Sequence, residues 1–297
     1  MPRLFSTALL FVLLGATAGA FVVTEGLKLE PSPVTKVFVT PKIFSPTCEC
    51  ETNLTLIGFR LRKADRLTLS IVDNGDNLVR TLLGPIAQPR GPVAATWDGR
   101  NDAGTVVPDG TYRPRVHLRH RTILMPNPIR VDTKAPVLRL RSVRPRVLEP
   151  GHVLRVRYRV TEPARVSLFL NGRRIVLGRS THLTWKVEWR AHGAPGKYRL
   201  TADARDVPGN VSAATRPVEI LIPLQVLTSH VVARPGSKFV VRLRTDGRAY
   251  VWRLRRRRGF TVAERLVLTA PPKAGRYTLV IRQDRIEHRI PLVVAKK

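Results

Sequence analysis

Cysteine and acidic residues are both scarce in this chain of 297 residues. It has 2 Cys and 2 Met, and its 21 Asp and Glu stand against 52 Lys and Arg. Two cysteines exclude a disulfide-dense scaffold and a four-cysteine zinc site built from one chain. The shortage of acid leaves a formal net charge of +31, and 41 of the cations are Arg. Because hydrophobic residues still make up 43% of the chain, we expect packed cores and not wholesale disorder.

An uncharged apolar segment lies at the start of the chain. It runs from Leu4 to Val23, close to the length of about 20 residues that a helix needs to cross a bilayer. Small residues at positions 16–20 fit a signal-peptidase site, whereas the apolar run continues past them. We expect residues 1–24 to be an uncleaved signal anchor, with a cleaved signal peptide as the alternative. The rest of the chain would be extracytoplasmic in both cases: anchored in the cytoplasmic membrane in the first, secreted in the second.

The remainder shows hardly any helical periodicity, and apolar residues alternate with polar ones. Between Leu154 and Val160 the apolar side chains fall on one face of a strand and three Arg fall on the other. A Gly-x-Tyr triplet occurs three times, ending at Tyr112, Tyr198 and Tyr277, and alternating residues follow each copy. These tyrosines are 86 and 79 residues apart, which suits one immunoglobulin-like β-sandwich of about 100 residues per copy. The sequence therefore predicts an all-β tandem array of three immunoglobulin-like sandwiches after the N-terminal helix.

Proline-containing connectors indicate where the domains begin and end. Residues 25–36 contain two Pro and no apolar periodicity, so we expect a short stalk there. The three sandwiches are expected over residues 37–131, 132–222 and 223–297. Short connectors between them favour a string of domains with limited hinge motion over a single globule.

Two sequence blocks in the first expected sandwich are distinctive. Thr96–Gly104 reads TWDGRNDAG, and Val107–Arg113 reads VPDGTYR. With the upstream hairpin at residues 64–82, they resemble the immunoglobulin-like domain first described in the flagellar hook-capping protein FlgD, which recurs in bacterial surface proteins. The second sandwich is similar at its ends, residues 131–136 and 202–210, to bacterial extracellular immunoglobulin-like repeats. The resemblance implies binding, spacing or assembly and no catalysis.

The residues of these blocks are predicted to be structural. Trp97 suits a sandwich core, Asp98 supplies turn chemistry, and each Gly of the Gly-x-Tyr triplets permits a turn before its strand. Each Tyr of those triplets can bury its ring while its hydroxyl finds a partner. The structural motif comprises Trp97, Asp98, Gly99, Gly104, Gly110, Tyr112, Tyr198 and Tyr277.

The two cysteines lie in a loop of the first sandwich. Related surface domains often have a Ser-Pro-Asn-Gly-Asp-Gly-like loop at this place, where this chain has Phe44–Cys50. A bridge between Cys48 and Cys50 closes across one residue and demands unusual geometry. We favour this local disulfide in an oxidising compartment, with free thiols, a metal pair or an intermolecular bridge as alternatives.

The sequence contains no recognisable catalytic constellation. His117 and His120 fall on opposite faces of an expected strand, which spoils a shared metal site. The carboxylates of residues 98–109 are better explained as turn formers than as calcium ligands, because Arg100 stands where an oxygen ligand is needed. We therefore expect no enzyme activity, no cofactor and no metal.

The excess of cations increases along the chain. The net charge is +1 for residues 1–36, then +5, +11 and +14 for the three sandwiches in order. The densest run is placed like a hairpin tip and comprises Arg253, Arg255, Arg256, Arg257 and Arg258. Such a tip suits phosphate, sulfate or carboxylate groups, so we expect an anionic envelope polymer, a membrane surface or a protein partner. No physiological nucleic acid is expected, because the sandwiches are expected outside the cytoplasm and the sequence contains no nucleic-acid-binding motif.

Two other interpretations of the array stay open. It is a structural spacer or assembly subunit if the arginines are merely solvated strand faces. It is an accessory subunit if an enzyme encoded elsewhere supplies the activity. The sequence does not indicate an oligomeric state.

Overall fold

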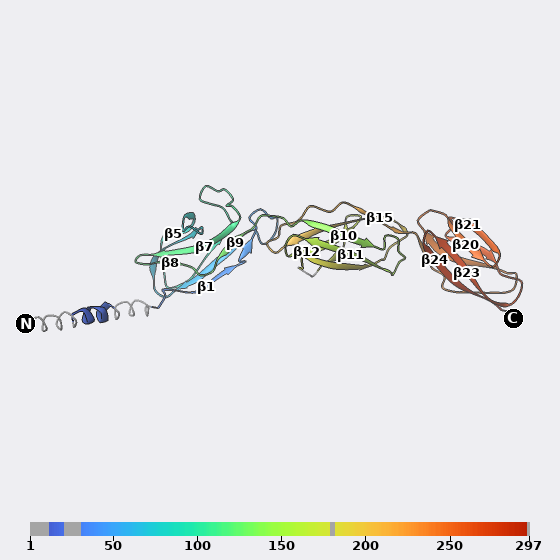
Figure 1. The fold of residues 1–297 in the computed structure, drawn as a ribbon, viewed down its shortest axis with the longest axis horizontal. Helices are drawn as coiled ribbons and strands as arrows, with labels where there is room; N and C mark the ends of the chain where they lie inside the picture. The colour runs from blue at the N-terminus through green and yellow to red at the C-terminus, as the bar shows by residue number, and fades with distance from the viewer. Residues whose placement is uncertain (1–11, 21–30, 179–181, 296–297) are drawn as a thin grey trace, which may run out of the picture. The chain divides into compact units, whose positions relative to one another are not determined.

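The computed structural model describes residues 12–20, 31–178 and 182–295. Residues 12–20 are helical, and within the described residues no helix has the length and apolarity to span a membrane (Figure 1). The rest of the expected anchor, residues 1–11 and 21–24, lies outside the described residues, so anchoring and cleavage stay predictions. All named elements are β-strands, which confirms the expected all-β fold.

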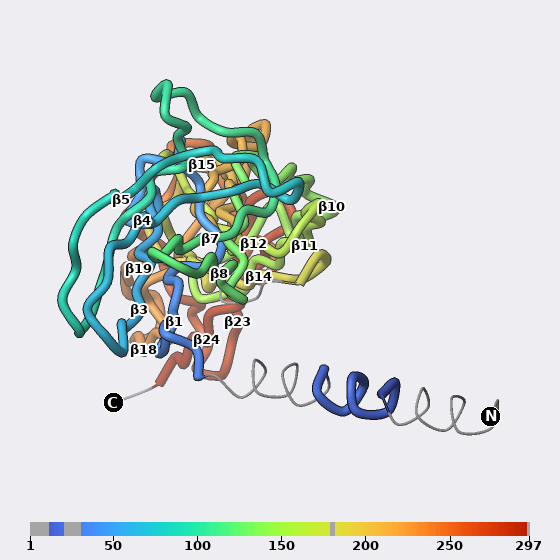
Figure 2. Tube along the Cα trace, turned by 90° about the vertical axis from the view of Figure 1, so that its left-hand side faces the viewer, coloured from blue at the N-terminus to red at the C-terminus, as the bar shows by residue number. Residues whose placement is uncertain are grey.

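The first sandwich belongs to a compact unit of residues 1–46 and 51–132. One sheet has the order β1-β3-β6, and the other has the order β2-β9-β7-β4-β5 with β8 paired to β7. The neighbours β5, β4 and β7 can be followed along the trace in Figure 2. The strands are β1 (Val34–Thr40), β2 (Ile43–Phe44), β3 (Thr55–Leu61), β4 (Asp65–Val72), β5 (Leu78–Gln88), β6 (Gly91–Trp97), β7 (Gly110–Leu118), β8 (Thr122–Leu124) and β9 (Ile129–Val131).

The second sandwich belongs to the other unit, residues 47–50 and 133–297. Its sheets have the orders β10-β11-β14 and β13-β12-β15-β16. The strands are β10 (Leu138–Arg144), β11 (Val153–Val160), β12 (Ala164–Leu170), β13 (Arg173–Leu177), β14 (Thr184–Arg190), β15 (Gly196–Asp206) and β16 (Val218–Ile222). In β11 the apolar side chains are buried and the arginines between them are exposed, as the alternation predicts.

The third sandwich completes the same unit. Its sheets have the orders β17-β19-β22 and β18-β24-β23-β20-β21. The strands are β17 (Leu224–Val226), β18 (Val231–Ala233), β19 (Lys238–Thr245), β20 (Tyr250–Leu254), β21 (Arg257–Thr261), β22 (Arg265–Thr269), β23 (Gly275–Gln283) and β24 (Ile286–Val294).

The three sandwiches repeat one topology. In each, the first strand pairs antiparallel with the next long strand: β1 with β3, β10 with β11, and β17 with β19. Between these two strands the chain crosses to the other sheet, where it pairs parallel with the last strand of the sandwich. This parallel pairing is β2 with β9, the bridge between Val147 and Leu221, and β18 with β24. The internal repeat seen in the Gly-x-Tyr triplets therefore extends over whole sandwiches of immunoglobulin-like form.

Each sandwich has its own hydrophobic core, formed by the inward faces of both sheets. Trp97 is fully buried in the first core, Tyr158 in the second and Tyr250 in the third. Each fully buried Leu, Ile or Val packed around these rings stabilises the fold by about 1.5–3 kcal/mol. Separate cores leave the outward strand faces and the turns free to carry charge.

Candidate functional site

The arginine run of the third sandwich forms a tight hairpin between β20 and β21. Arg253 pairs with Arg258 and Leu254 pairs with Arg257, so Arg255 and Arg256 alone make the turn. Arg255 has a φ of 54°, a left-handed conformation that two-residue hairpin turns require and that Gly or Asn adopts more readily. All five arginines are exposed. We call Arg253 and Arg255–Arg258 the arginine hairpin.

The charge of the arginine hairpin is not neutralised by nearby carboxylates. In the part of the chain that the structure describes, none of the five guanidinium groups forms an ion pair. Arg255 lies over the ring of Tyr277, with its guanidinium carbon 5.5 Å from the ring centroid. Arg253 and Arg258 face each other directly across the strand pair, and like charges in that position destabilise a sheet. The hairpin is therefore poorly explained as a stabilising device.

Apolar side chains flank the arginine hairpin. Phe260 is 81% exposed and pairs with Val251, which is also exposed. On the other face Trp252 covers Gly259, where an added Cβ would lie 2.8 Å from the indole Nε1. The strand pattern of the sequence did not indicate the exposure of Phe260 or the contact between Trp252 and Gly259, although a Gly directly after an arginine run is a signal for a close side-chain contact.

Trp97 lies at the centre of the first core. It is fully buried, and its indole N–H donates to the Arg100 carbonyl at 2.9 Å. The rings of Phe44 and Tyr112 meet it edge-on, at centroid distances of 5.6 and 5.2 Å. These contacts place Trp97 in the scaffold.

The turn after Trp97 is held by its own polar groups. The Asp98 carboxylate accepts from the backbone N–H of Arg100 at 3.1 Å, and the Arg100 guanidinium donates to the Gly104 carbonyl at 2.7 Å. Gly99 has a φ of 71°, and a Cβ there would lie 2.2 Å from Cγ of Pro46. Gly104, at a φ of 77°, closes the turn. The Asp98 and Arg100 side chains are thus used within the turn itself.

The three tyrosines of the Gly-x-Tyr triplets make one recurring contact. Each follows a Gly that begins a strand, Gly110 in the first copy, and each hydroxyl donates to the carbonyl four residues upstream. The distances are 2.7 Å for Tyr112, 2.5 Å for Tyr198 and 2.8 Å for Tyr277. This is the tyrosine corner of immunoglobulin-like sandwiches. Burial, with a smaller effect from nearby carboxylates, raises the pKa of Tyr112, whose ring is buried; the other two are half-buried.

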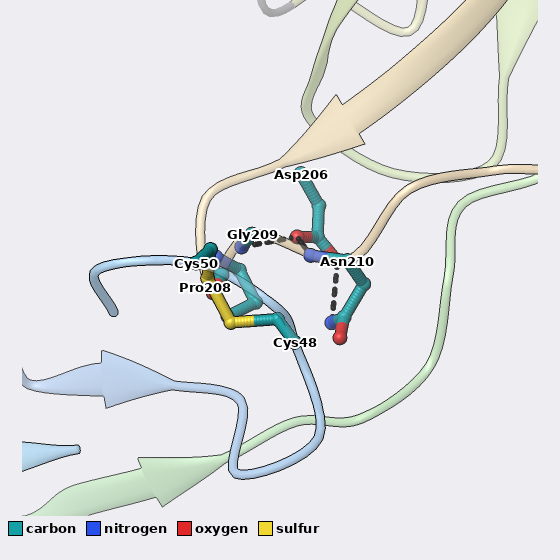
Figure 3. The surroundings of a disulfide bond; sticks show 6 residues. All are labelled: Cys48, Cys50, Asp206, Pro208, Gly209 and Asn210. Atoms are coloured by element: carbon teal, nitrogen blue, oxygen red, sulfur yellow. Dashed lines mark hydrogen bonds between the residues drawn. A yellow bond between two sulfur atoms is a disulfide. The ribbon is translucent and has the colours of Figure 1, made fainter. Parts of the chain in front are cut away.

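Cys48 and Cys50 form a disulfide with each other (Figure 3). Both sulfurs lie 3.7 Å from the carbonyl oxygen of Pro208, a packing contact because a disulfide sulfur carries no proton. The loop around Pro208 is held by the Asp206 carboxylate, which accepts from the backbone N–H groups of Gly209 and Asn210 at 2.8 and 2.7 Å. The residues around the disulfide thus form a structural loop. Over the described ranges, no cluster of three or more His, Cys, Asp or Glu residues fits a metal ion.

Comparison with known proteins supports the resemblance found in the sequence. The family model of the FlgD Ig-like domain matches residues 51–120, so the FlgD-type resemblance of the first sandwich is confirmed over these residues. A search of curated protein sequences found no match.

Among solved structures, the chain is similar to fibronectin(III)-like modules of Clostridium thermocellum CbhA. The identity is 16% and the TM-score 0.36, over 63% of this chain and 93% of that one. A three-domain structure of titin has 10% identity and a TM-score of 0.34, over 90% of this chain and 100% of that one. The human OSCAR ligand-binding domain has 14% identity and a TM-score of 0.33, over 62% and 96%. Similarities of this size concern the fold alone.

Proposed function

We propose that this chain is a non-enzymatic protein of the bacterial cell envelope that binds anionic envelope polymers through the arginine hairpin. Its N-terminal segment would hold it at the outer side of the cytoplasmic membrane. The observation that carries the proposal is a tight turn with five exposed arginines and no carboxylate partner in the described residues. Guanidinium groups donate in a planar fork that matches phosphate, sulfate and carboxylate oxygens.

A polymer suits the hairpin better than a small anion does. One exposed ion contact contributes only about 0.2–1 kcal/mol, so useful affinity needs several contacts at once. A polymer with repeated negative groups supplies several contacts along one chain, so it does not need to enclose each arginine. Anionic lipid headgroups or an acidic protein surface offer the same groups, and the test below separates charge at the hairpin from charge elsewhere.

The test measures binding of the full chain to fluorescently labelled, purified anionic envelope glycopolymer at low and high salt. One variant carries Arg→Gln at the five hairpin positions. The control carries Arg→Gln at five exposed positions of the second sandwich and has the same net charge; these are Arg139, Arg157, Arg159, Arg165 and Arg173.

We expect the hairpin variant to bind about tenfold more weakly or worse, and the control to stay near wild type. Binding should also weaken as salt increases, because exposed charges are screened within about 10 Å at 0.1 M. Equal losses in both variants would show that overall charge, and not the hairpin, attracts the polymer. Binding that is insensitive to salt would reject the electrostatic proposal.

The second candidate is a spacer or assembly subunit, working alone or beside an enzyme encoded elsewhere. It is favoured by the repetition of one topology and of one tyrosine corner in each copy. An unchanged cellular phenotype after removal of the hairpin charge would support this role over polymer binding.

A further inference from the structure

A second group of arginines lines a cavity of about 600 Å³ in the unit of residues 133–297. Arg141, Arg144 and Arg146 come from the second sandwich, and Arg285 comes from the third. In the third sandwich, Arg285 lies in the turn between β23 and β24, whereas the arginine hairpin is at the other end of β20. The cavity is therefore separate from the arginine hairpin.

Strand pairing holds the backbone of each of these arginines. The pairing of β10 with β11 passes from Leu140 to Ser142, so Arg141 is the extra residue of a bulge, a device that re-aims a side chain. Arg144 is the last paired residue of β10. The Arg146 carbonyl accepts from the Leu221 N–H at 2.7 Å. Arg285 belongs to a two-residue turn closed by the last pair of β23 and β24. The site is thus built on ordered backbone.

The two contributing sandwiches are joined by a minimal connector. β16 ends at Ile222 and β17 begins at Leu224, which leaves Pro223 alone between them. Ile222 and Leu224 are both fully buried, in the second and third cores respectively. The connector therefore restricts how far Arg285 can move from the other three arginines.

The positive charge of the cavity is not neutralised. None of the lining residues is acidic, and none of the four arginines forms an ion pair among the described residues. The acidic residues nearest in sequence are engaged elsewhere. Asp284, beside Arg285, pairs with Arg248 at 2.6 Å, and Glu149 lies 3.6 Å from His288. Four exposed guanidinium groups without a counter-charge give this hollow a positive potential that attracts anions.

The fold itself does not require arginines at this corner. The first sandwich has the same crossing between its sheets, where the Lys42 carbonyl accepts from the Arg130 N–H at 2.8 Å. Lys42 thus corresponds to Arg146, and Thr40 corresponds to Arg144, with a Pro between them in both sandwiches. Because Thr and Lys suffice for the crossing in the first sandwich, the arginines of the second are explained by a ligand better than by the fold.

We infer that this cavity binds a phosphate-bearing group, such as the phosphoester of a polymer or of a lipid headgroup. The cavity volume of about 600 Å³ falls within the range of about 300–1,000 Å³ that is usual for ligand pockets. Phosphate oxygens can accept hydrogen bonds from several guanidinium groups at once, each through two parallel N–H donors. The ammonium group of Lys is a single point charge and does not provide this paired geometry. The inference extends the proposed function by adding a defined site to it, and the experiment separates the two.

The experiment uses the full chain and two probes. Calorimetric titration with tripolyphosphate reports a soluble source of phosphate, and flotation with phosphatidylglycerol vesicles reports a headgroup source. The variants are Arg144→Gln with Arg146→Gln, Arg285→Gln alone, and Arg144→Lys, which keeps the charge and removes the fork. The control is the variant of the second sandwich described above, with Arg→Gln at Arg139, Arg157, Arg159, Arg165 and Arg173, and the hairpin variant is measured beside it. All substituted side chains are exposed, and thermal melting verifies that each variant is folded.

We expect the Gln variants to lose at least tenfold in affinity for one of the two probes, and Arg144→Lys to lose severalfold. The control variant of the second sandwich should keep that affinity. If the Gln variants bind either probe more weakly than wild type, the result supports the site, and the probe concerned identifies the source of the phosphate group. Equal binding of both probes by wild type and the Gln variants would overturn the inference, as would binding that only the hairpin variant loses. Loss of glycopolymer binding in the hairpin variant tests the proposed function independently of these outcomes.

Discussion

The first and third sandwiches have the same topology but use their charged residues in different ways. In the first, the Asp73 carboxylate accepts from the backbone N–H groups of Gly75 and Asn77 at 2.8 and 2.9 Å. The side-chain hydrogen bond from Asn77 lowers the pKa of Asp73. Arg100 is likewise engaged with the Gly104 carbonyl. In the third, the arginine hairpin is exposed and has no carboxylate partner in the described part of the chain.

The difference shows that one β-sandwich plan can either engage the charged groups of a turn within the fold or leave them exposed. The turn after Trp97 is closed by its own hydrogen bonds, so changes there should reduce stability. The arginine hairpin contains a direct like-charge pair, so changes there should affect binding and change stability by at most about 1 kcal/mol. Three predictions test this contrast, and a fourth concerns His288 of the third sandwich.

The largest effect is expected in the first core. Trp97→Ala should lower the free energy of unfolding by about 3–5 kcal/mol, because it empties a fully buried site and removes two ring contacts. Phe260→Ala beside the arginine hairpin should change it by less than about 0.5 kcal/mol, since that ring is 81% exposed. Urea unfolding of both variants measures the difference. Similar losses in the two would contradict the contrast.

The tyrosine corners should differ in the same direction. Tyr112→Phe should cost about 0.5–1.5 kcal/mol, because it removes a part-buried hydrogen bond to the Pro108 carbonyl. Tyr277→Phe should fall at the low end of that range, because its partner carbonyl at Lys273 is exposed and water can replace the hydroxyl. Thermal unfolding of the two variants compares them, and a larger loss for Tyr277→Phe would be the contrary result.

A smaller effect of opposite sign is expected in the arginine hairpin. Arg258→Glu replaces a like-charge pair with Arg253 by an opposite-charge pair, which should stabilise the third sandwich by about 0.2–1 kcal/mol. The same change should weaken polymer binding severalfold. Arg258→Gln serves as the control and should lie between the two. A variant that is more stable and binds the polymer as well as wild type would separate the arginines from the proposed function.

The smallest effect is expected in the pH dependence of the second unit. Burial is the main reason that the pKa of His288 lies below its ordinary value; the facing groups are Glu149, which raises it, and His152, which lowers it. As pH decreases, His288 therefore takes up a proton in the unfolded chain before it does so in the folded chain. The free energy of unfolding should then fall as pH decreases below about 6.5. His288→Gln should flatten this dependence in urea unfolding at several pH values. If the pH dependence of stability is the same in the variant, groups other than His288 cause it.

Much of the fold was accessible from local patterns. The alternation from Leu154 to Val160 predicts β11 because side chains of a strand alternate between its faces. The Gly-x-Tyr triplets predict the repeat, since a strand that begins at a Gly and carries a tyrosine corner needs both residues at fixed spacing. The arginine run ending at Arg258 predicts a hairpin tip, which the pairing of β20 with β21 contains.

Other features depend on contacts that no local pattern encodes. Phe260 was missed because exposure of an apolar side chain is decided by the neighbouring strands. The packing of the Cys48–Cys50 disulfide on Pro208 joins residues 158 and 160 positions apart. The exposure of one ring and the partner of one loop are both set by chain segments distant in sequence.

The amino-acid sequence by itself determined the strand periodicity, the repeat, the excess of positive charge and the position of its densest run, because each is a property of neighbouring residues. Only the tertiary structure decided which cations among the described residues find a partner and which gather around a hollow. Arg144 and Arg285 belong to different sandwiches and line one cavity only because the chain crosses between sheets and continues through the single residue Pro223. Electrostatic interactions depend on distance in space, and folding sets that distance.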